Sequence, residues 1–361
     1  MILLKRINEI NKNVPVSIER FISKDMENYL ILKDGYIIAK SLDNSFDTVN
    51  IITPEDDSYM DYYMQNKEIF NYSDDAFDYN YNEANSSLII SVPKNEVVTK
   101  TLHVFYVQET DELVHNTLII LNENSVFNYF EYIANETESH VSFVSNSIVK
   151  ENARLTYTGL SRLSEKVVFS AIRNGYVSRY GNIDLSVAEV NDSMTQSNTN
   201  IFLLEKYATA STKTVAITNH EQEARFKQLV EHLAPETEGF IENYGVANNN
   251  SILVFEGIGK INKNMKQSVA RQSNKGIVLG VNSRLDANPL LLIDEFDVIA
   301  SHGAAIGKMD DEQLYYLMSR GLTLNNAQRL IISGFLSPVL KKLSTDSLKE
   351  EFVHAVENKT L

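Results

Sequence analysis

Cysteine is absent from the sequence. The chain therefore forms no disulfide bond and supplies no thiolate to a metal ion. Long apolar runs are missing as well: none approaches the roughly 20 residues that a membrane-spanning helix needs, so we expect no contact with a membrane. The opening segment, MILLKRINEI, is only weakly apolar and lacks the hydrophobic core of a signal peptide, which predicts a cytoplasmic protein.

Common catalytic and metal-binding motifs are also missing. The sequence has no G-x-x-x-x-G-K-[ST] phosphate loop, so the chain is not itself an ATPase, and its histidines show no H-E-x-x-H spacing. The G-x-G-K sequence at 257–260 is too short for a phosphate loop and predicts a strand-end bulge or a turn. The loose cluster at 220–223 (HEQE) is interpreted as a solvated acidic turn rather than a metal site.

Basic residues are scarce in the first part of the chain. Residues 1–150 carry 11 Lys and Arg against 24 Asp and Glu, whereas residues 151–361 carry 22 against 24. This acidic excess argues against nucleic acid as a partner, because carboxylates repel phosphates. The tyrosines between 59 and 81 could stack on a single strand, but the surrounding carboxylates favour packing of a peripheral segment.

Short β-strands dominate the middle of the chain. From Leu88, runs such as TLHVFYV and NTLIIL are rich in β-branched and aromatic residues, with breaks about every 8–12 residues. A sandwich, a barrel and a solenoid all satisfy this spacing. The single Asn-Gly hairpin signal and the Asn- and Ser-rich turns favour a solenoid, although no strict repeat is visible.

Helical patterns occupy both ends of the chain. Residues 1–32 have apolar residues at helical spacing. Asp310 is a good N-cap, and Gly321 stops the helix that it opens. Thr323 caps a second helix, and residues 344–357 predict a third. These helices could dock a partner or close the end of a solenoid.

The segment 284–321 combines several of these signals. A proline-led apolar run at 290–293 predicts a buried strand, and an acidic turn follows at 294–297. Residues 298–300 predict the next strand, which Ser301-His302-Gly303 interrupts. His302 is the only side chain at this predicted switch from strand to helix that ordinarily titrates near neutral pH.

A family resemblance rests on motifs in this segment and upstream of it. The chain resembles the SufB/SufD family, and the SufD branch most closely, over about residues 85–345. The matching motifs are Pro289, Asp297-Val298, Ser301-His302-Gly303-Ala304, Ser319-Arg320-Gly321, Gly334-Phe335, His232-Leu-Ala-Pro235-x-Thr237 and Ala270-x-Gln272-x-Asn274.

The resemblance implies a mainly β fold with three parts. Residues 1–85 would form a short helical and irregular segment, residues 86–300 a right-handed parallel β-helix, and residues 301–361 a helical partner-binding module. SufD relatives usually carry an N-terminal motif that contains tryptophan. This chain has no tryptophan, so nothing functional from that motif transfers.

The resemblance also implies a function, that of a non-catalytic scaffold subunit in iron–sulfur cluster assembly. A SufB-like paralogue would supply the thiolates, and a SufC-like ABC ATPase would dock on the C-terminal helices. The chain alone would hold no stable cofactor, only a transient cluster at the interface with its partner. Whether the chain also forms a homodimer stays open.

Five residues are candidates for this function. In relatives, the histidine that matches His302 is placed at the SufB interface, and a neutral imidazole is a competent iron ligand. From its spacing alone, His302 would be a structural histidine. Tyr315, Tyr316 and Arg320 are expected to bind the ATPase, because their residue types are common in interface hot spots. Phe335 either joins them or packs in the core.

Two other classes of function remain open. Asp294, Glu295 and Asp297 could be the carboxylates of a carbohydrate-active β-helix lyase or hydrolase, or the chain could be a plain solenoid binding scaffold. His232 is interpreted as a hydrogen-bonded structural histidine. A basic cluster is interpreted as a solvated face, with an anionic partner surface as the alternative; it comprises Lys260, Lys263, Lys266, Arg271 and Lys275.

Overall fold

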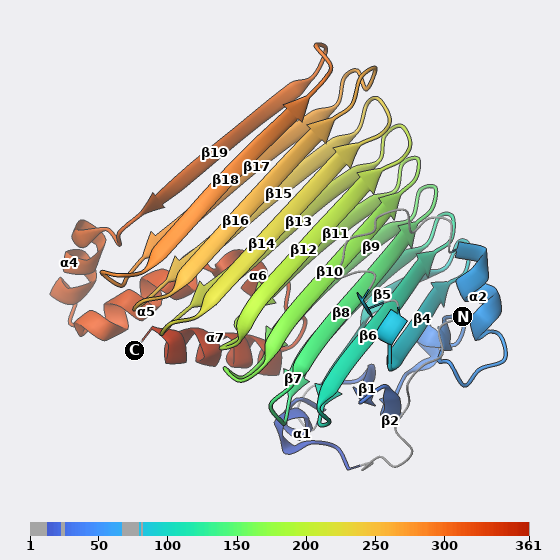
Figure 1. Ribbon diagram of the computed structural model, residues 1–361, viewed down its shortest axis with the longest axis horizontal. Helices are drawn as coiled ribbons and strands as arrows, with labels where there is room; N and C mark the ends of the chain where they lie inside the picture. The colour runs from blue at the N-terminus through green and yellow to red at the C-terminus, as the bar shows by residue number, and fades with distance from the viewer. Residues whose placement is uncertain (1–12, 23–25, 67–78, 81, 361) are drawn as a thin grey trace.

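The computed structural model describes residues 13–22, 26–66, 79–80 and 82–360. The chain winds through two facing sheets, and each pass through both sheets forms one coil of a parallel solenoid (Figure 1). Strands of one sheet alternate along the sequence with strands of the other from β4 to β19. Each coil therefore stacks directly on the preceding one.

Sheet A contains ten strands and sheet B contains nine. All neighbouring strands pair in parallel except β1 with β2 and β3 with β4, which are antiparallel. In order across sheet A the strands are β2 (Tyr36–Ser41), β1 (Tyr29–Lys33), β5 (Val97–Gln108), β7 (Val126–Asn135), β9 (Arg154–Arg162), β11 (Asn182–Glu189), β13 (Thr209–Thr218), β15 (Glu238–Ala247), β17 (Val269–Val278) and β19 (Ile299–Gly307). In order across sheet B they are β3 (Asn50–Ile52), β4 (Ser86–Val92), β6 (Glu112–Leu121), β8 (His140–Val149), β10 (Val168–Val177), β12 (Met194–Leu203), β14 (Glu223–His232), β16 (Ile252–Ile261) and β18 (Arg284–Ile293).

Helices flank the solenoid at both chain ends. The N-terminal part holds α1 (Val16–Ile22), the 3₁₀ turn η1 (Asn44–Phe46) and α2 (Tyr59–Asn66). The C-terminal part holds α4 (Asp311–Ser319), α5 (Leu324–Phe335), α6 (Ser337–Leu340) and α7 (Asp346–Lys359). Asp310 caps α4 and Thr323 caps α5, as the sequence predicts.

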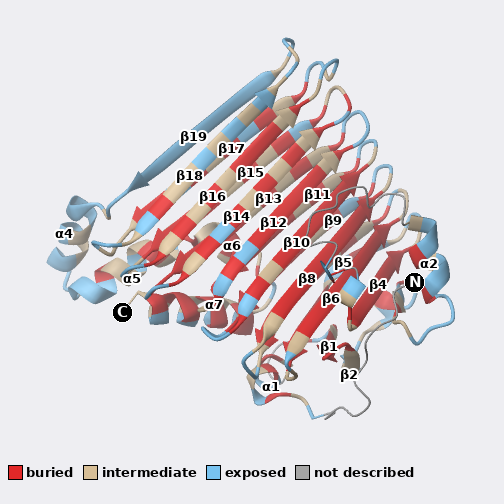
Figure 2. Ribbon diagram, in the orientation of Figure 1, coloured by how far each residue is buried: buried red, intermediate tan, exposed pale blue. Residues whose placement is uncertain are grey.

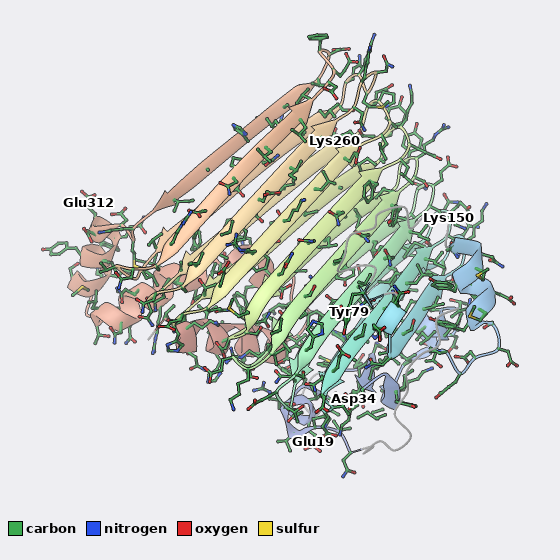
Figure 3. All side chains as sticks on the ribbon, in the orientation of Figure 1. Glu19, Asp34, Tyr79, Lys150, Lys260 and Glu312 are labelled. Carbon is green, nitrogen blue, oxygen red and sulfur yellow. The ribbon has the colours of Figure 1, made fainter. Side chains whose placement is uncertain are left out.

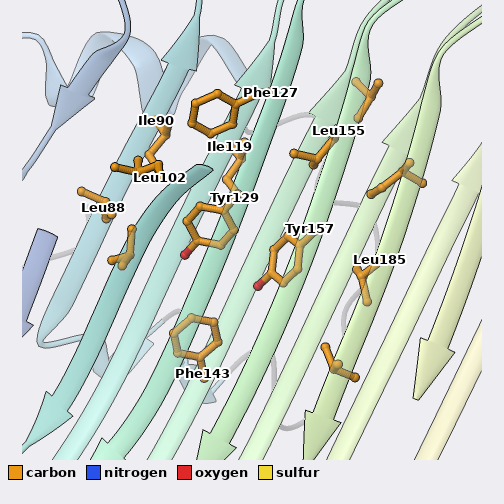
Figure 4. Close-up of a cluster of buried hydrophobic side chains, with 14 of the residues drawn as sticks. Leu88, Ile90, Leu102, Ile119, Phe127, Tyr129, Phe143, Leu155, Tyr157 and Leu185 are labelled. Carbon is orange, nitrogen blue, oxygen red and sulfur yellow. The ribbon is translucent and has the colours of Figure 1, made fainter. Parts of the chain in front are cut away.

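The interior of the solenoid is a stack of side chains in register. Tyr129 and Tyr157 occupy paired positions on β7 and β9, with ring centroids 5.0 Å apart (Figure 4). The interior also holds charge: buried Arg173 contacts Glu131 at 2.8 Å and Glu189 at 3.1 Å. Stacking in register therefore continues apolar and polar rows from coil to coil.

The turns from sheet B to sheet A repeat one backbone conformation. Asn95, Asn124 and Asn152 have positive φ values of 64°, 61° and 56°, which asparagine tolerates better than most residues. Each of the two later side-chain amides donates to the oxygen of the preceding one, at 2.8 and 2.9 Å. Tyr180 and Tyr207 continue this column of left-handed turns with stacked rings.

A second apolar layer covers the outer face of sheet A. Phe105 and Tyr132 on the sheet pack in one buried cluster with Phe21 of α1 and Phe352 of α7. Figure 2 shows the strands in the middle of the solenoid buried along most of their length. The C-terminal helices α5, α6 and α7 are thus part of the core.

The predicted mainly β, parallel β-helix with C-terminal helices is confirmed. Three early strands, β1 to β3, were not predicted, and β1 extends sheet A beyond β5. The G-x-G-K sequence lies inside β16 rather than at a strand end. In the tyrosine-rich segment, Tyr59 and Tyr63 are buried against sheet B, as the packing interpretation expects, whereas Tyr72 and Tyr81 lie outside the described residues.

Candidate partner-binding site at the open end of the solenoid

The solenoid ends without a cap at its last coil. The strands β18 and β19 are the final strands of their sheets, and within the described chain no further strand pairs with either. All nine residues of β19 are exposed (Figure 2). Two facing strand edges therefore lie open at this end, whereas the strands between the first and the last of each sheet are paired on both sides.

The free edge of β19 presents unused backbone donors. The amide of Ile299 donates to Ser268 at 3.0 Å, so the amides of the odd-numbered residues of β19 face β17. Because alternate residues of a strand face opposite sides, the amides of Ala300, His302, Ala304 and Ile306 face outward. An unpaired strand edge of this kind is a template for another strand.

His302 lies in the middle of β19, in register with Gln272 of β17. The predicted interruption at Ser301-His302-Gly303 is therefore wrong, because pairing with β17 carries the strand through to Gly307. The same row runs back through Ile241 in the solenoid interior, so the imidazole belongs to the inner face. It is exposed there because no coil follows.

Apolar side chains surround the open end. Leu290 and Leu292 of β18 are 43% and 49% exposed, and Ile299 and Ile306 of β19 are 56% and 39% exposed. Nothing lies within 4 Å of a side-chain carbon built on Gly303. The end therefore combines apolar surface, free backbone donors and room for the close approach of another chain. The strand predicted at 290–293 is present, but its predicted burial is wrong, because β18 is the last strand of its sheet. The exposure of Ile299 and Ile306 was not predicted, since it follows only from their place in the last coil.

The acidic turn after β18 is a structural turn. The Glu295 carboxylate accepts bonds from the amides of Asn264 and Phe296, both at 2.9 Å. Hydrogen bonds from the amides of Phe296 and Asp297 are the main cause that lowers the pKa of Glu295. A carboxylate committed to backbone amides is a poor acid catalyst, so Glu295 does not support the lyase or hydrolase alternative.

The helix α4 stands at the edge of the molecule, next to the open end (Figure 1). It contains no buried residue. Tyr315 and Tyr316 are 77% and 56% exposed, and the guanidinium of Arg320 lies 5.2 Å from the ring centre of Tyr316. Gly321 ends the helix with a φ of +98°, as the sequence predicts. The structure thus brings these three predicted residues together on one exposed surface.

Phe335 belongs to a different environment from these residues. Its ring packs edge-on against Tyr244 of β15, with centroids 5.7 Å apart, and it is half-buried. This contact supports the core alternative.

The residues of the predicted basic cluster lie in different places. Lys260 of β16 pairs with Glu231 at 2.8 Å near the turns (Figure 3), whereas Arg271 lies on the outer face of β17.

Two buried histidines serve the fold. Nδ1 of His232 lies 2.7 Å from the Thr237 hydroxyl, which agrees with its interpretation as a structural residue. Burial lowers the pKa of His232 to about 4 and that of His115 to about 3.

Among the described residues, no three His, Cys, Asp or Glu side chains are placed to hold a metal ion together. No helix in that part of the chain is long and apolar enough to cross a membrane.

These features define a class of protein: a parallel β-solenoid with an open end and a helix exposed beside it. The chain belongs to the SufB/SufD family, because residues 105–335 match the family model described as the SUF system FeS cluster assembly, SufBD core domain. Within the family it is SufD-like.

Individual relatives agree with this assignment. The chain is 35% identical over 281 residues to the iron–sulfur cluster assembly protein SufD of Bacillus subtilis, covering 76% of this chain and 64% of that protein. It is 26% identical over 259 residues to an iron–sulfur cluster assembly SufBD family protein of Staphylococcus epidermidis, covering 70% and 56%. The chain therefore spans somewhat less than two thirds of the length of these relatives.

Proposed function

We propose that this chain is a non-catalytic scaffold subunit of a cytoplasmic iron–sulfur cluster assembly complex. It pairs through its open end with a SufB-like subunit and docks a SufC-like ATPase on α4. The observation that carries the proposal is the exposed edge of β19, where apolar side chains and outward-facing amides coincide. A homodimer through the same edge is the competing use of this surface.

The chemistry of the chain requires the partner to complete a cluster site. Iron–sulfur clusters are commonly held by thiolates, and this sequence has no cysteine. His302 can contribute one imidazole at the open end, where it is exposed on the inner face. The proposed partner therefore supplies the thiolates, and the cluster is cargo that forms at the interface.

A proline at a position of β19 whose amide faces outward tests the proposed pairing with the SufB-like subunit. Ala304→Pro removes an amide that faces the open edge and leaves the amides that bond β17 in place. Ala304→Ser at the same position keeps the outward amide and serves as the control. Mixed with the SufB-like partner, Ala304→Pro is expected to lose association at least about 10-fold, as measured by sedimentation, while the isolated chain keeps its melting temperature.

Two results would contradict the proposed pairing. One is an Ala304→Pro chain that binds the partner as tightly as the Ala304→Ser chain. The other is a wild-type chain that forms only a stable homodimer through β19 and excludes the SufB-like partner.

A further inference from the structure

Four buried side chains in the last coils contain polar atoms without a hydrogen-bond partner. These four atoms, which are among several of their kind in the described part of the chain, are Oε1 of Gln228, Oδ1 of Asn243, Oε1 of Gln272 and Nδ2 of Asn274. The four residues are 0–5% exposed. A buried polar atom without a partner destabilises the folded state, so four such atoms in one region require an explanation.

The four side chains close a ring inside the solenoid. Gln228 on sheet B donates to Thr214 across the core, and Thr214 is in register with Asn243 on sheet A. Asn243 donates to Asn274 on the next coil at 2.7 Å. Their positions therefore connect the two sheets and two successive coils.

Gln272 completes the ring from sheet A back to sheet B. It follows the same inner face of β17 as Asn274, two residues earlier. A side-chain carbon on Gly257 would lie 2.7 Å from its Oε1 atom, and Gly257 is in register with Gln228. The missing side chain at Gly257 therefore makes room for the Gln272 amide, which lies against sheet B beside the position of Gln228.

We propose that this ring is a buried water-binding site, with water as its resident ligand. The lining side chains are amides and a hydroxyl without charge, which disfavours an anion or a divalent cation. Three of the unpartnered atoms are oxygens that need a donor, and one is a nitrogen that needs an acceptor. Water both donates and accepts, and buried waters typically make about three bonds to otherwise unpartnered groups.

The site lies one coil beneath the open end. Asn274 is in register with Ala304, and Gln272 is in register with His302. The strand β19 therefore separates the water site from the surface at which we place the partner. The inner face below His302 is wet rather than apolar, so a partner that covers the end would seal these waters in place. The water site itself does not depend on the proposed function.

Water relaxation measurements on the isolated full chain test the site. We expect ¹⁷O magnetic relaxation dispersion to detect long-lived internal water, and a crystal structure at about 1.5 Å to show ordered water within hydrogen-bond distance of at least two of the four amides. A site without water, in which the side-chain amides are reoriented and hydrogen-bond to one another, would overturn the proposal. A metal ion in place of water would overturn it as well.

A variant and a matched control test whether the relaxation dispersion comes from water at this site. Gln228→Leu removes one lining amide and is expected to reduce the dispersion amplitude. Tyr129→Phe removes a buried hydroxyl that bonds Tyr106 in the early coils, at 2.9 Å, and is expected to leave the amplitude unchanged. Equal amplitudes in Gln228→Leu and wild type would refute the assignment. That result would leave the pairing of β19 with a partner unaffected.

Discussion

Lys359 shows how one residue near the end of the chain is held by the solenoid. Its ammonium group lies 2.9 Å from a carboxylate oxygen of Asp192 and donates to Gln222 at 3.0 Å, and the side chain is almost completely buried. Burial is the main cause that lowers the pKa of Lys359 from 10.5 to about 8, against the attraction of Asp192. The lysine therefore fastens the last turn of α7 and makes the stability of the protein depend on pH.

The sign of this dependence follows from proton binding. Between pH 8 and 10.5 the unfolded chain holds the lysine proton more tightly than the folded chain, so the free energy of unfolding rises with pH. The slope approaches about 1.4 kcal/mol per pH unit. Urea unfolding at several pH values should show this rise from pH 8 to 9.5 in the wild type and not in Lys359→Met. Parallel profiles for the two proteins would contradict the assignment.

His302 combines exposure with a position on the inner face. His302→Ala removes an exposed side chain, so the free energy of unfolding of the isolated chain should change by no more than about 0.5 kcal/mol. Cluster formation in the reconstituted complex should fall about 10-fold or more, because losing even an outer-shell partner of a metal has effects of this size. Cluster absorbance measures the loss.

His302→Cys is the matched variant for this experiment. A thiolate can also ligate iron, so this variant should recover part of the cluster yield that His302→Ala loses. A His302→Ala complex that builds clusters at the wild-type rate would exclude a role for the imidazole.

At the scale of the element, α4 differs from the other C-terminal helices. The helices α5, α6 and α7 each bury side chains, whereas α4 buries none. A helix with half-exposed leucines and two exposed tyrosines presents an apolar surface of the kind that binds another protein. The helix therefore suits partner docking rather than core formation.

The double variant Tyr315→Ala, Tyr316→Ala tests the docking of the ATPase. Each lost hot-spot tyrosine costs about 2 kcal/mol or more of binding, so affinity for the SufC-like ATPase should fall at least about 30-fold. Tyr180→Ala, 52% exposed on the turn column, is the control. Calorimetric titration gives the affinities, and equal binding by the double variant and the control would refute the docking surface.

Strands were easier to predict from the sequence than their arrangement. The strand β6 (ELVHNTLIIL) is buried at almost every position, because the interior lies on one face and other segments cover the other. Such a strand has no alternation of apolar and polar residues, so its two faces cannot be told apart from the sequence. The turn residues favoured a solenoid over a sandwich only modestly, and the choice therefore rested mainly on the family resemblance.

The candidate site was predicted only in part, for a related reason. The motif around His302 marked the residue, but the apparent break at Ser301 and Gly303 hid the strand that carries it. Small residues weaken a strand pattern even where pairing with a neighbour such as β17 supplies the backbone bonds. Tyr315, Tyr316 and Arg320 were predicted as one exposed group because helical spacing is visible in the sequence.

At the scale of the whole molecule, the helices α1 and α7, which are far apart in the sequence, meet on sheet A. Arg20 of α1 pairs with Glu351 of α7 at 2.7 Å, and His103 of β5 lies 2.6 Å from the hydroxyl of Ser344. Phe21 and Phe352 belong to the same buried cluster. The helices at the two ends and sheet A should therefore unfold together.

Phe352→Ala tests this cooperativity. Removing a buried phenylalanine costs about 3–5 kcal/mol, so urea unfolding should shift strongly while keeping a single transition by circular dichroism and by tyrosine fluorescence. Lys349→Ala, on the exposed side of the same helix, should cost no more than about 1 kcal/mol. Separate transitions for helix and sheet would show that the C-terminal helices form an independent unit.

The column of left-handed turns has a consequence for how a chain of this kind changes its length over evolution. Adding or removing one residue within a strand exchanges its inner and outer faces. Adding or removing a whole coil of roughly 30 residues keeps every turn and every inner row in place. Length differences among solenoids of this architecture should therefore occur in steps of one coil, or as insertions at turns that lie outside the asparagine and tyrosine column.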